Sequence, residues 1–312
     1  MDNVIKDSFH GIYKIFSTMK NSLKPVKLYS GLIKRFFLDK NLQEKYYKKK
    51  QIDNLILSFT SFPARINFAE FTLFSIIQQS VRPEKIILWL SEEEFPEKEK
   101  AIPNSLKKYF VLDFEIRFVK GNIRSYHKLV HALKKFPDYV IVTFDDDVYY
   151  KPDWLELLYK THIEYPRDII AHRVHTISFK NGFPESYNNW QPSKNTVSFL
   201  NFPTAVGGNL YPPLSLFRDA CSRDLFLRLS PAADDIWFYA MAVLQKTRIR
   251  KVKNGYSKAF DFDYILDDEY KSIPKLADIN VKNNQNDVQL KNVLEHYNLY
   301  DSFYNLYGQQ EQ

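Results

Sequence analysis

The segment VIVTFDDDVYY, residues 140–150, places three consecutive carboxylates, Asp145, Asp146 and Asp147, directly after an apolar run. Carboxylates this close repel one another, and a carboxylate beside a core is costly unless a cation balances it. Mg²⁺ or Mn²⁺ accepts oxygen ligands and leaves coordination positions open for phosphate oxygens. The triplet therefore predicts a divalent-metal site. The competing interpretation is a cluster of aspartates in a turn or at the start of a helix.

Strand-like and helix-like segments alternate from residue 51 onward and would position this triplet. We predict strands at 54–60, 85–90, 114–119, 139–144 and 168–174, and helices at 67–80, 126–136 and 152–165. This alternation predicts an α/β fold with a mostly parallel sheet flanked by helices. Ligands of such sheets bind beyond the carboxyl ends of the strands, where the triplet lies.

Composition bounds the class of protein. The 312 residues are 45% hydrophobic, so the chain can bury a sizeable core. The single cysteine, Cys221, excludes a disulfide within the chain and favours a reducing, cytoplasmic compartment. No apolar run approaches the roughly 20 residues that a spanning helix needs. We expect a catalytic domain at 51–265 and a helical tail at 266–312.

The basic charge is concentrated near the N-terminus. Residues 1–50 hold twelve Lys or Arg and four Asp or Glu, so this segment carries +8 and the remaining residues −1 of the total of +7. This argues against a nucleic-acid-binding body. Apolar residues interleave with the basic ones, which predicts a helical extension that lies on the anionic inner face of the cell membrane. The alternative is a helical pair packed on the domain.

Five motifs in their order resemble the nucleotide-sugar glycosyltransferases of the GT-A fold, most closely the family-two enzymes that build bacterial capsules or lipopolysaccharide. These motifs are LILSFTSFPARI, GNIRSYHKLVHAL, the Asp-x-Asp strand, GGNLYPP and PAADDIWFYAMAV, and the resemblance covers roughly residues 54–250. The resemblance implies that Asp145 faces the donor ribose and that Asp147, together with Asp145, ligates the metal. Asp146 fits either place, because three aspartates leave the register open.

A second acidic pair, Asp234 and Asp235, begins a segment with apolar residues at helical spacing. In inverting transferases of this type such a pair supplies the catalytic base. The resemblance therefore implies that Asp235 takes the proton of the acceptor hydroxyl. The alternative is a helix N-cap followed by a first-turn acid. Both roles are compatible if Asp234 caps the helix and Asp235 is the base.

Further side chains are candidates for donor or acceptor contacts. Arg65 and Lys128 would neutralise diphosphate oxygens or form surface ion pairs. Thr60 and Phe62 would flank the nucleobase of the donor. Gly207, Gly208 and Tyr211 would form a wall near the donor sugar and acceptor, while Tyr187 and Trp190 would stack on acceptor sugars or pack in the core. His172 and His175 are expected to be structural histidines rather than metal ligands.

Together these features predict a metal-dependent, inverting glycosyltransferase that uses Mn²⁺ or Mg²⁺. The expected donor is a nucleotide sugar, with UDP as its nucleotide, and the expected acceptor is a glycan or a lipid-linked saccharide of bacterial surface polysaccharide. Three alternatives stay open: a retaining transferase, a metal-dependent nucleotidyltransferase, and a non-catalytic glycan-binding subunit.

Overall fold

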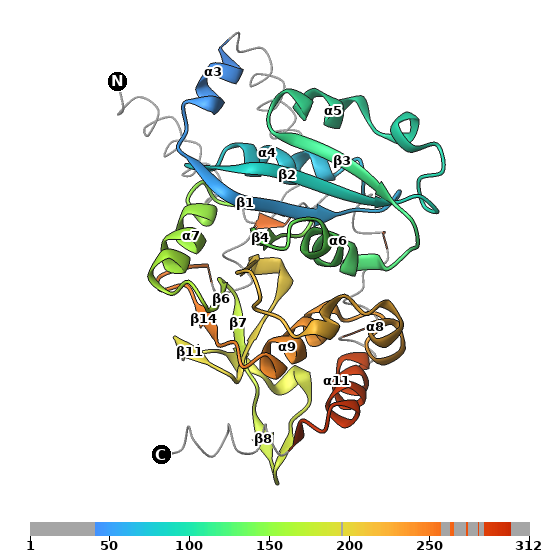
Figure 1. The fold of residues 1–312 in the computed structure, drawn as a ribbon, viewed down its shortest axis with the longest axis vertical. Coiled ribbons are helices and arrows are strands. Elements are labelled where there is room, and N and C mark those ends of the chain that lie inside the picture. The colour runs from blue at the N-terminus through green and yellow to red at the C-terminus, as the bar shows by residue number, and fades with distance from the viewer. Residues whose placement is uncertain are drawn as a thin grey trace, which may run out of the picture.

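The computed structural model describes residues 41–194, 196–256, 263–264, 273, 280 and 284–300. Its centre is an eight-stranded sheet with the order β11-β14-β6-β13-β4-β1-β2-β3 (Figure 1). The strands are β1 (Gln51–Thr60), β2 (Arg82–Ser91), β3 (Phe114–Val119), β4 (Val140–Thr143), β6 (Ile169–Ala171), β11 (Val197–Ser198), β13 (Asn209–Tyr211) and β14 (Ile249–Lys251).

The sheet is mixed, with its longest strands parallel. β4, β1, β2 and β3 run parallel side by side, and β14 runs parallel to β6. β13 lies antiparallel between β4 and β6, and β11 is antiparallel to β14. Four of these seven neighbouring pairs are parallel, which confirms the expected α/β class with a mostly parallel sheet.

Helices cover both faces of the sheet, so the strands are buried on both sides. Along β1, Leu55 and Leu57 point into one apolar core and Ile56 points into the other. The first core includes residues of α4 (Ala69–Ile77), α5 (Asn104–Lys107) and α7 (Trp154–Glu164). The second includes residues of α6 (His127–Lys135), α8 (Arg223–Leu229), α9 (Asp234–Leu244) and α11 (Gln285–His296).

The predicted strand at 168–174 is wrong in one respect, because the chain divides there into two strands. β6 ends at Ala171 in the main sheet, and β7 (Val174–Thr176) joins a separate three-stranded sheet with β10 (Gln191–Pro192) and β12 (Asn201–Pro203). The other predicted strands and helices are found within a few residues of their expected limits. The break brings β7 and the segment after it toward the carboxyl end of β4.

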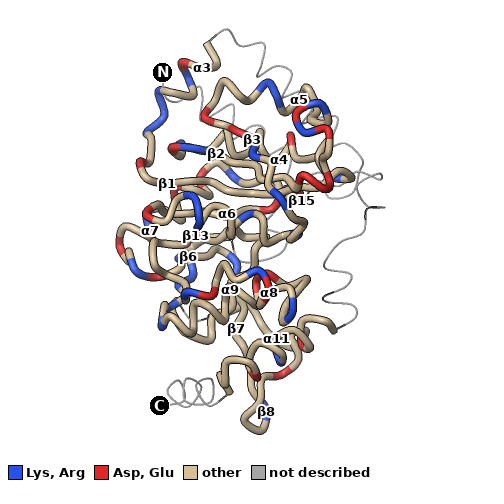
Figure 2. Tube along the Cα trace, turned by 45° about the vertical axis from the view of Figure 1, so that its right-hand side comes forward, with Lys and Arg blue, Asp and Glu red and all other residues tan. Residues whose placement is uncertain are grey.

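The smaller elements lie at the periphery of the main sheet. They are α3 (Leu42–Tyr47), the pair β5 (Val148–Tyr149) and β15 (Asp263–Tyr264), and the hairpin β8 (Phe179–Lys180) with β9 (Phe183–Pro184). Residues 1–40 lie outside the described residues, so the helical N-terminal extension stays a prediction. Within the described ranges, no helix has both the length and the apolar character needed to cross a membrane. Basic and acidic residues are interspersed over the described elements (Figure 2).

Candidate active site

A cavity of about 900 Å³ opens beyond the carboxyl ends of β1 and β4. The loop after β1, the loop after β4, and the starts of α6 and α9 all contribute to its lining. The sequence-predicted residues that line it are Thr60, Phe62, Arg65, Lys128, Asp145, Asp146, Asp147, Tyr187, Trp190, Asp234 and Asp235. Segments far apart in sequence therefore meet at the sheet edge where ligands of α/β proteins bind.

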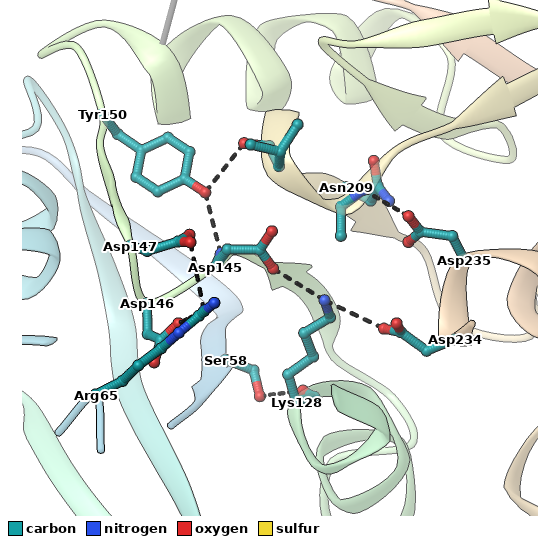
Figure 3. A network of polar contacts seen from close by, with 12 residues as sticks. Ser58, Arg65, Lys128, Asp145, Asp146, Asp147, Tyr150, Asn209, Asp234 and Asp235 are labelled. Carbon is teal, nitrogen blue, oxygen red and sulfur yellow. Dashed lines mark hydrogen bonds and ion pairs between the residues drawn. The ribbon is translucent and has the colours of Figure 1, made fainter. Parts of the chain in front are cut away.

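The last two aspartates of the triplet are paired with Arg65. Asp146 is 5% exposed and accepts hydrogen bonds from Ser61 Oγ at 2.6 Å and from Arg65 Nη1 at 3.0 Å. The same Nη1 lies 3.3 Å from Asp147 Oδ2. One guanidinium thus balances two neighbouring carboxylates, and Asp146 is oriented toward the loop after β1 (Figure 3).

Asp145 is oriented differently, toward α6. Its Oδ1 lies 3.0 Å from Lys128 Nζ, and its backbone N–H donates to the Tyr150 hydroxyl at 3.0 Å. That hydroxyl in turn donates to the carbonyl of Val206 at 3.2 Å. Tyr150 is 1% exposed, so this chain of hydrogen bonds fixes the backbone at Asp145 from the core side.

Lys128 joins the triplet to the second acidic pair. Its Nζ lies 3.0 Å from Asp145 Oδ1 and 3.1 Å from Asp234 Oδ2, and the residue is 5% exposed (Figure 3). Burial opposes the charged amine, but the carboxylates of Asp145 and Asp234 outweigh it and raise the pKa of Lys128 well above its ordinary value. Lys128 is therefore a permanent cation between two carboxylates.

The expectation that Asp234 caps α9 is wrong. The N-cap residue is Ala233, no side chain caps this end, and Asp234 is the first helical residue. Its carboxylate instead forms an ion pair with the buried Lys128, whose Nζ lies 3.1 Å from Asp234 Oδ2. Both acids still lie in the first helical turn, where negative charge is favourable.

Asp235 lines the cavity next to this ion pair. Its Oδ2 accepts a hydrogen bond from the backbone N–H of Ala205 at 3.1 Å. Burial, followed by the charge of Asp234, raises the pKa of Asp235 to about 7, although its side chain is partly accessible from the cavity. A carboxyl with a pKa near the working pH is suited to accept and release a proton.

The donor set fits a divalent cation that shares its coordination with a ligand. Within the described residues, no group of three or more His, Cys, Asp or Glu side chains is arranged to hold a metal. Asp145 and Asp147 nevertheless both face the cavity, where the ion pairs of the described chain set two cations, Lys128 and Arg65, against four aspartates. Mg²⁺ typically binds one or two carboxylates together with substrate phosphates and water, so this set is compatible with it.

Three predicted contact residues do not line the cavity. Ala205 and Val206 line it, whereas Gly207, Gly208 and Tyr211 do not. Trp154 Nε1 donates to the carbonyl of Gly207 at 2.7 Å, and Gly208 packs on the same indole. Gly208 has φ +80°, a conformation that glycine adopts at little cost. The glycine pair therefore packs on Trp154, directly after the lining residues Ala205 and Val206 in the chain.

The remaining candidates divide between the cavity and the core. Thr60 and Phe62 line the cavity, but the Thr60 hydroxyl donates to the carbonyl of Trp89 at 2.8 Å. Tyr187 and Trp190 line the opposite part and also pack on Phe202, with ring centroids 5.8 and 5.1 Å away.

The two histidines have different surroundings. The fully buried His172 has both ring nitrogens within hydrogen-bond reach of backbone groups, the carbonyl of Trp154 and the N–H of Tyr256. It is therefore a structural histidine. His175 lines the cavity, and burial, followed by the charge of Arg173, lowers its pKa to about 4.

Several cavity residues were not predicted from the sequence. Ser61 lies next to the predicted Thr60 and Phe62, so a hydroxyl beside the first strand end could have been proposed. Arg173 was predicted to lie inside the strand 168–174, but it follows the end of β6. Its Nη1 donates to Thr204 Oγ1 at 3.0 Å. Asn280 and Asn286 come from a polar stretch without any motif, and only the fold brings them to the cavity.

One protein-family model matches part of the chain. Residues 94–226 match the sequence model described as Glycosyl transferase family 2. The match covers less than half of the chain, and it shows that this stretch is similar to a glycosyltransferase family 2 domain. The matched stretch contains the aspartate triplet and ends before Asp234 and Asp235. No curated protein matches the chain.

Solved structures share part of this fold at low sequence identity. Residues 1–349 of S. aureus TarS in complex with UDP-GlcNAc are 14% identical, covering 73% of this chain and 62% of that chain, with a TM-score of 0.44. The mannosyltransferase PcManGT from Pyrobaculum calidifontis with GDP-Man and Mn²⁺ is 12% identical, covering 73% and 64%, with a TM-score of 0.41. An apo UDP-glucose pyrophosphorylase is 7% identical, covering 80% and 98%, with a TM-score of 0.40. The chain spans under two thirds of the length of the first two structures.

Proposed function

We propose that this protein is a metal-dependent, inverting glycosyltransferase with Asp235 as its general base. The observation that carries the proposal is the arrangement of two acidic groups around one cavity, linked by Lys128. One group, Asp145 and Asp147, suits a metal and a diphosphate. The other contains Asp235, whose pKa of about 7 suits proton transfer at neutral pH.

The donor would occupy the part of the cavity next to β1 and β4. Thr60 and Phe62 are available there to flank the nucleotide base, and Asp145 is available to the ribose. A divalent cation held by Asp147 and Asp145 would stabilise the departing nucleoside diphosphate. Arg65 orients Asp146 and Asp147 rather than facing the ligand alone, since its Nη1 is within 3.0 and 3.3 Å of the two carboxylates.

The acceptor would enter on the side of Tyr187 and Trp190, whose rings offer faces for a sugar. Its hydroxyl attacks the anomeric carbon, the bond to the diphosphate oxygen breaks, and Asp235 takes the hydroxyl proton. The hydrogen bond from the Ala205 N–H holds one carboxylate oxygen of Asp235 and leaves the other for this proton. The ion pair with Lys128 holds Asp234 in place beside the base.

The pathway is part of the same proposal. We propose that the acceptor is a glycan or a lipid-linked saccharide of bacterial surface polysaccharide, that UDP is the nucleotide of the donor, and that catalysis takes place in the cytoplasm. The basic residues of 1–50 would bring the enzyme to the inner face of the membrane.

Titration calorimetry with nucleoside diphosphates tests the donor site. UDP with Mn²⁺ should bind, and both chelation of the metal and the substitution Asp147→Asn should weaken this binding severely. Equal UDP affinity with and without metal would contradict the metal role. Hydrolysis of UDP-glucose or UDP-GlcNAc that releases UDP supports a transferase, whereas a nucleotidyltransferase would form or consume diphosphate. Retention of the anomeric configuration in the product would favour the retaining alternative.

A further inference from the structure

The C-terminal helix α11 contacts two segments of the cavity wall through buried polar side chains. It lies beyond residues 94–226, which match the family, and it packs on α8 and α9 rather than on the central sheet (Figure 1). Its inward face continues from Asn286 and Gln289 to Leu290, Val293 and Leu294, at helical spacing. The apolar part of this face packs in the core. Its first turn is polar where it reaches the cavity.

The first segment held by α11 leads into the acidic pair of α9. Gln289 is 4% exposed, and its Oε1 accepts the backbone N–H of Ala232 at 2.8 Å. Asn280 Nδ2 donates to the carbonyl of the same residue at 2.6 Å, and Gln289 Nε2 donates to Asn280 Oδ1 at 3.2 Å. Both backbone polar groups of Ala232 are thus held by two linked amides, three residues before Asp235.

The second segment carries Tyr187. Asp287 Oδ1 accepts the backbone N–H of Tyr187 at 2.7 Å, and its Oδ2 accepts the hydroxyl of Ser186 at 2.6 Å. Asn284, which precedes the helix, accepts a hydrogen bond from the Asn188 amide at 3.1 Å. Asn286, between these contacts, lines the cavity.

These contacts orient the backbone of the two segments more than they stabilise the core. A buried amide contributes little net stability when it is paired and is costly when it is not, so Gln289 and Asn280 tolerate only one arrangement of Ala232. Asp287 imposes the same requirement on the backbone of Tyr187. The two segments that bound the proposed acceptor space are therefore both held by α11.

We propose that α11 is a positioning element of the active site, which fixes the segment that carries Asp235 and the segment that carries Tyr187 at a set distance from each other. This rests on the proposed function in that these segments bound the acceptor side. The residues of α11 that act through others are Gln289 and Asp287. Asn286 would contact the acceptor directly.

Hydrogen exchange measured by mass spectrometry on the full chain tests the two attachments separately. Gln289→Met keeps the side-chain length and removes both amide contacts, and Asp287→Asn keeps the volume but replaces one acceptor by a donor. We expect exchange to rise about tenfold or more at 229–236 in the first variant and at 185–190 in the second. Peptides from β1 and β4 should be unchanged. Lys291→Gln, whose side chain is 65% exposed on the same helix, is the control and should change neither segment.

A second measurement separates positioning from general loss of stability. In the otherwise wild-type chain, Asp235→Asn should alter the pH dependence of unfolding between pH 5 and 8, because the carboxyl titrates in that range. The charged groups that act on the Asp235 carboxyl are Asp234, Lys128 and Asp145, and the hydroxyls of Tyr126, Tyr187 and Tyr211 also interact with it. If Gln289 holds this segment, the pH-dependent effect of Asp235→Asn should shrink to less than about half when it is combined with Gln289→Met. A purely structural loss would lower stability equally at all pH values.

The outcomes distinguish this inference from the proposed function. Unchanged exchange at 229–236 and 185–190 in the two variants, or an equal rise throughout the sheet, would overturn the positioning role. Titration of the same proteins with UDP and Mn²⁺ should give affinities within about twofold of wild type, because the donor side does not touch α11. If wild-type protein fails to bind UDP, the donor proposal fails, while the exchange data still decide the role of α11.

Discussion

Lys128 Nζ lies 3.1 Å from Asp234 Oδ2, and this buried ion pair joins the first turns of α6 and α9. The pair connects the donor side of the cavity to the helix that carries the proposed base. Two charges removed from water stabilise a fold only when they are paired with each other, since each alone bears its full desolvation cost. The relationship therefore makes Lys128 a residue whose loss affects both halves of the site.

Lys128→Met should destabilise the protein by about 3–5 kcal/mol, because it leaves Asp145 and Asp234 without their shared cation. Urea unfolding followed by circular dichroism measures this change. Lys160→Met is the matched control, since Lys160 is 69% exposed and its ion pair with Glu156 should contribute about 0–1 kcal/mol. Equal effects of the two substitutions would show that the buried pair has no special weight.

Asp235 should make the folded state less stable as the pH rises toward neutrality. Its pKa is about 7 in the folded protein, above the roughly 3.9 of a free Asp, so the folded state retains a proton that the unfolded state loses. The stability linked to that proton is complete below about pH 4 and is lost as the pH rises through 7. Asp235→Asn should therefore be more stable than wild type at pH 8, by up to about 4 kcal/mol and less where the cavity hydrates the carboxylate.

The control for this pH dependence is Asp234→Asn. That substitution removes the partner of Lys128 and should destabilise the protein at pH 8, although it also removes an acid from the same helical turn. Urea unfolding at pH 5, 6, 7 and 8 compares the three proteins. A stability difference between wild type and Asp235→Asn that stays constant over this range would contradict the raised pKa.

The parts of the site that were predictable from the sequence are those that local patterns encode. An apolar run followed by three aspartates indicates a buried strand and an acidic strand end without any knowledge of the fold. The partners of those aspartates are not encoded locally, since Arg65 lies 81 residues before Asp146 in the chain. Chemistry could name Arg65 as a cation of the site, but only the packing of the loop after β1 gives it two carboxylates.

The break between β6 and β7 could not be predicted for a related reason. The residues 168–174 are apolar enough for one strand, and alternation alone does not reveal where a chain leaves a sheet. In the fold, the backbone of Arg173 lies close to Gly207. A Cβ added to Gly207 would lie 2.7 Å from Arg173 N. This contact depends on two segments more than thirty residues apart.

Gly208→Ala should destabilise the protein by about 2–4 kcal/mol, because the residue has φ +80° and its new Cβ would lie 2.2 Å from Trp154 Cζ2. Gly121→Ala is the control, with a similar φ of +83°, and there the Cβ would meet only the end of the Arg223 side chain. That change should cost about 1–2 kcal/mol. Thermal unfolding of both variants separates steric clash from backbone strain, and equal losses would contradict the role assigned to the Trp154 contact.

Removal of residues 1–50 should abolish binding to anionic membranes. The segment carries a net charge of +8, and each Lys or Arg near an anionic surface contributes about 1 kcal/mol, screened by salt. Co-sedimentation with vesicles that contain phosphatidylglycerol, at low and high salt, measures the binding. The full chain should sediment with the vesicles at low salt and less at high salt. If the shortened chain sediments equally well, the membrane role of this segment is wrong.

Asp235→Asn should reduce sugar transfer about 10²–10⁴-fold while leaving the affinity for nucleotide nearly unchanged. The amide keeps the volume of the carboxylate, and its oxygen can still accept the hydrogen bond from the Ala205 N–H, but it cannot take a proton at neutral pH. Asp147→Asn should instead weaken both transfer and UDP binding, because Asp147 belongs to the metal side of the cavity. In the wild-type enzyme, the transfer rate should decrease as the pH is lowered through about 7, because Asp235 becomes protonated there. Steady-state rates from pH 5 to 9, together with calorimetric UDP affinities, compare the three proteins. Near-normal transfer by a folded Asp235→Asn protein would remove the base assignment and place the retaining mechanism first.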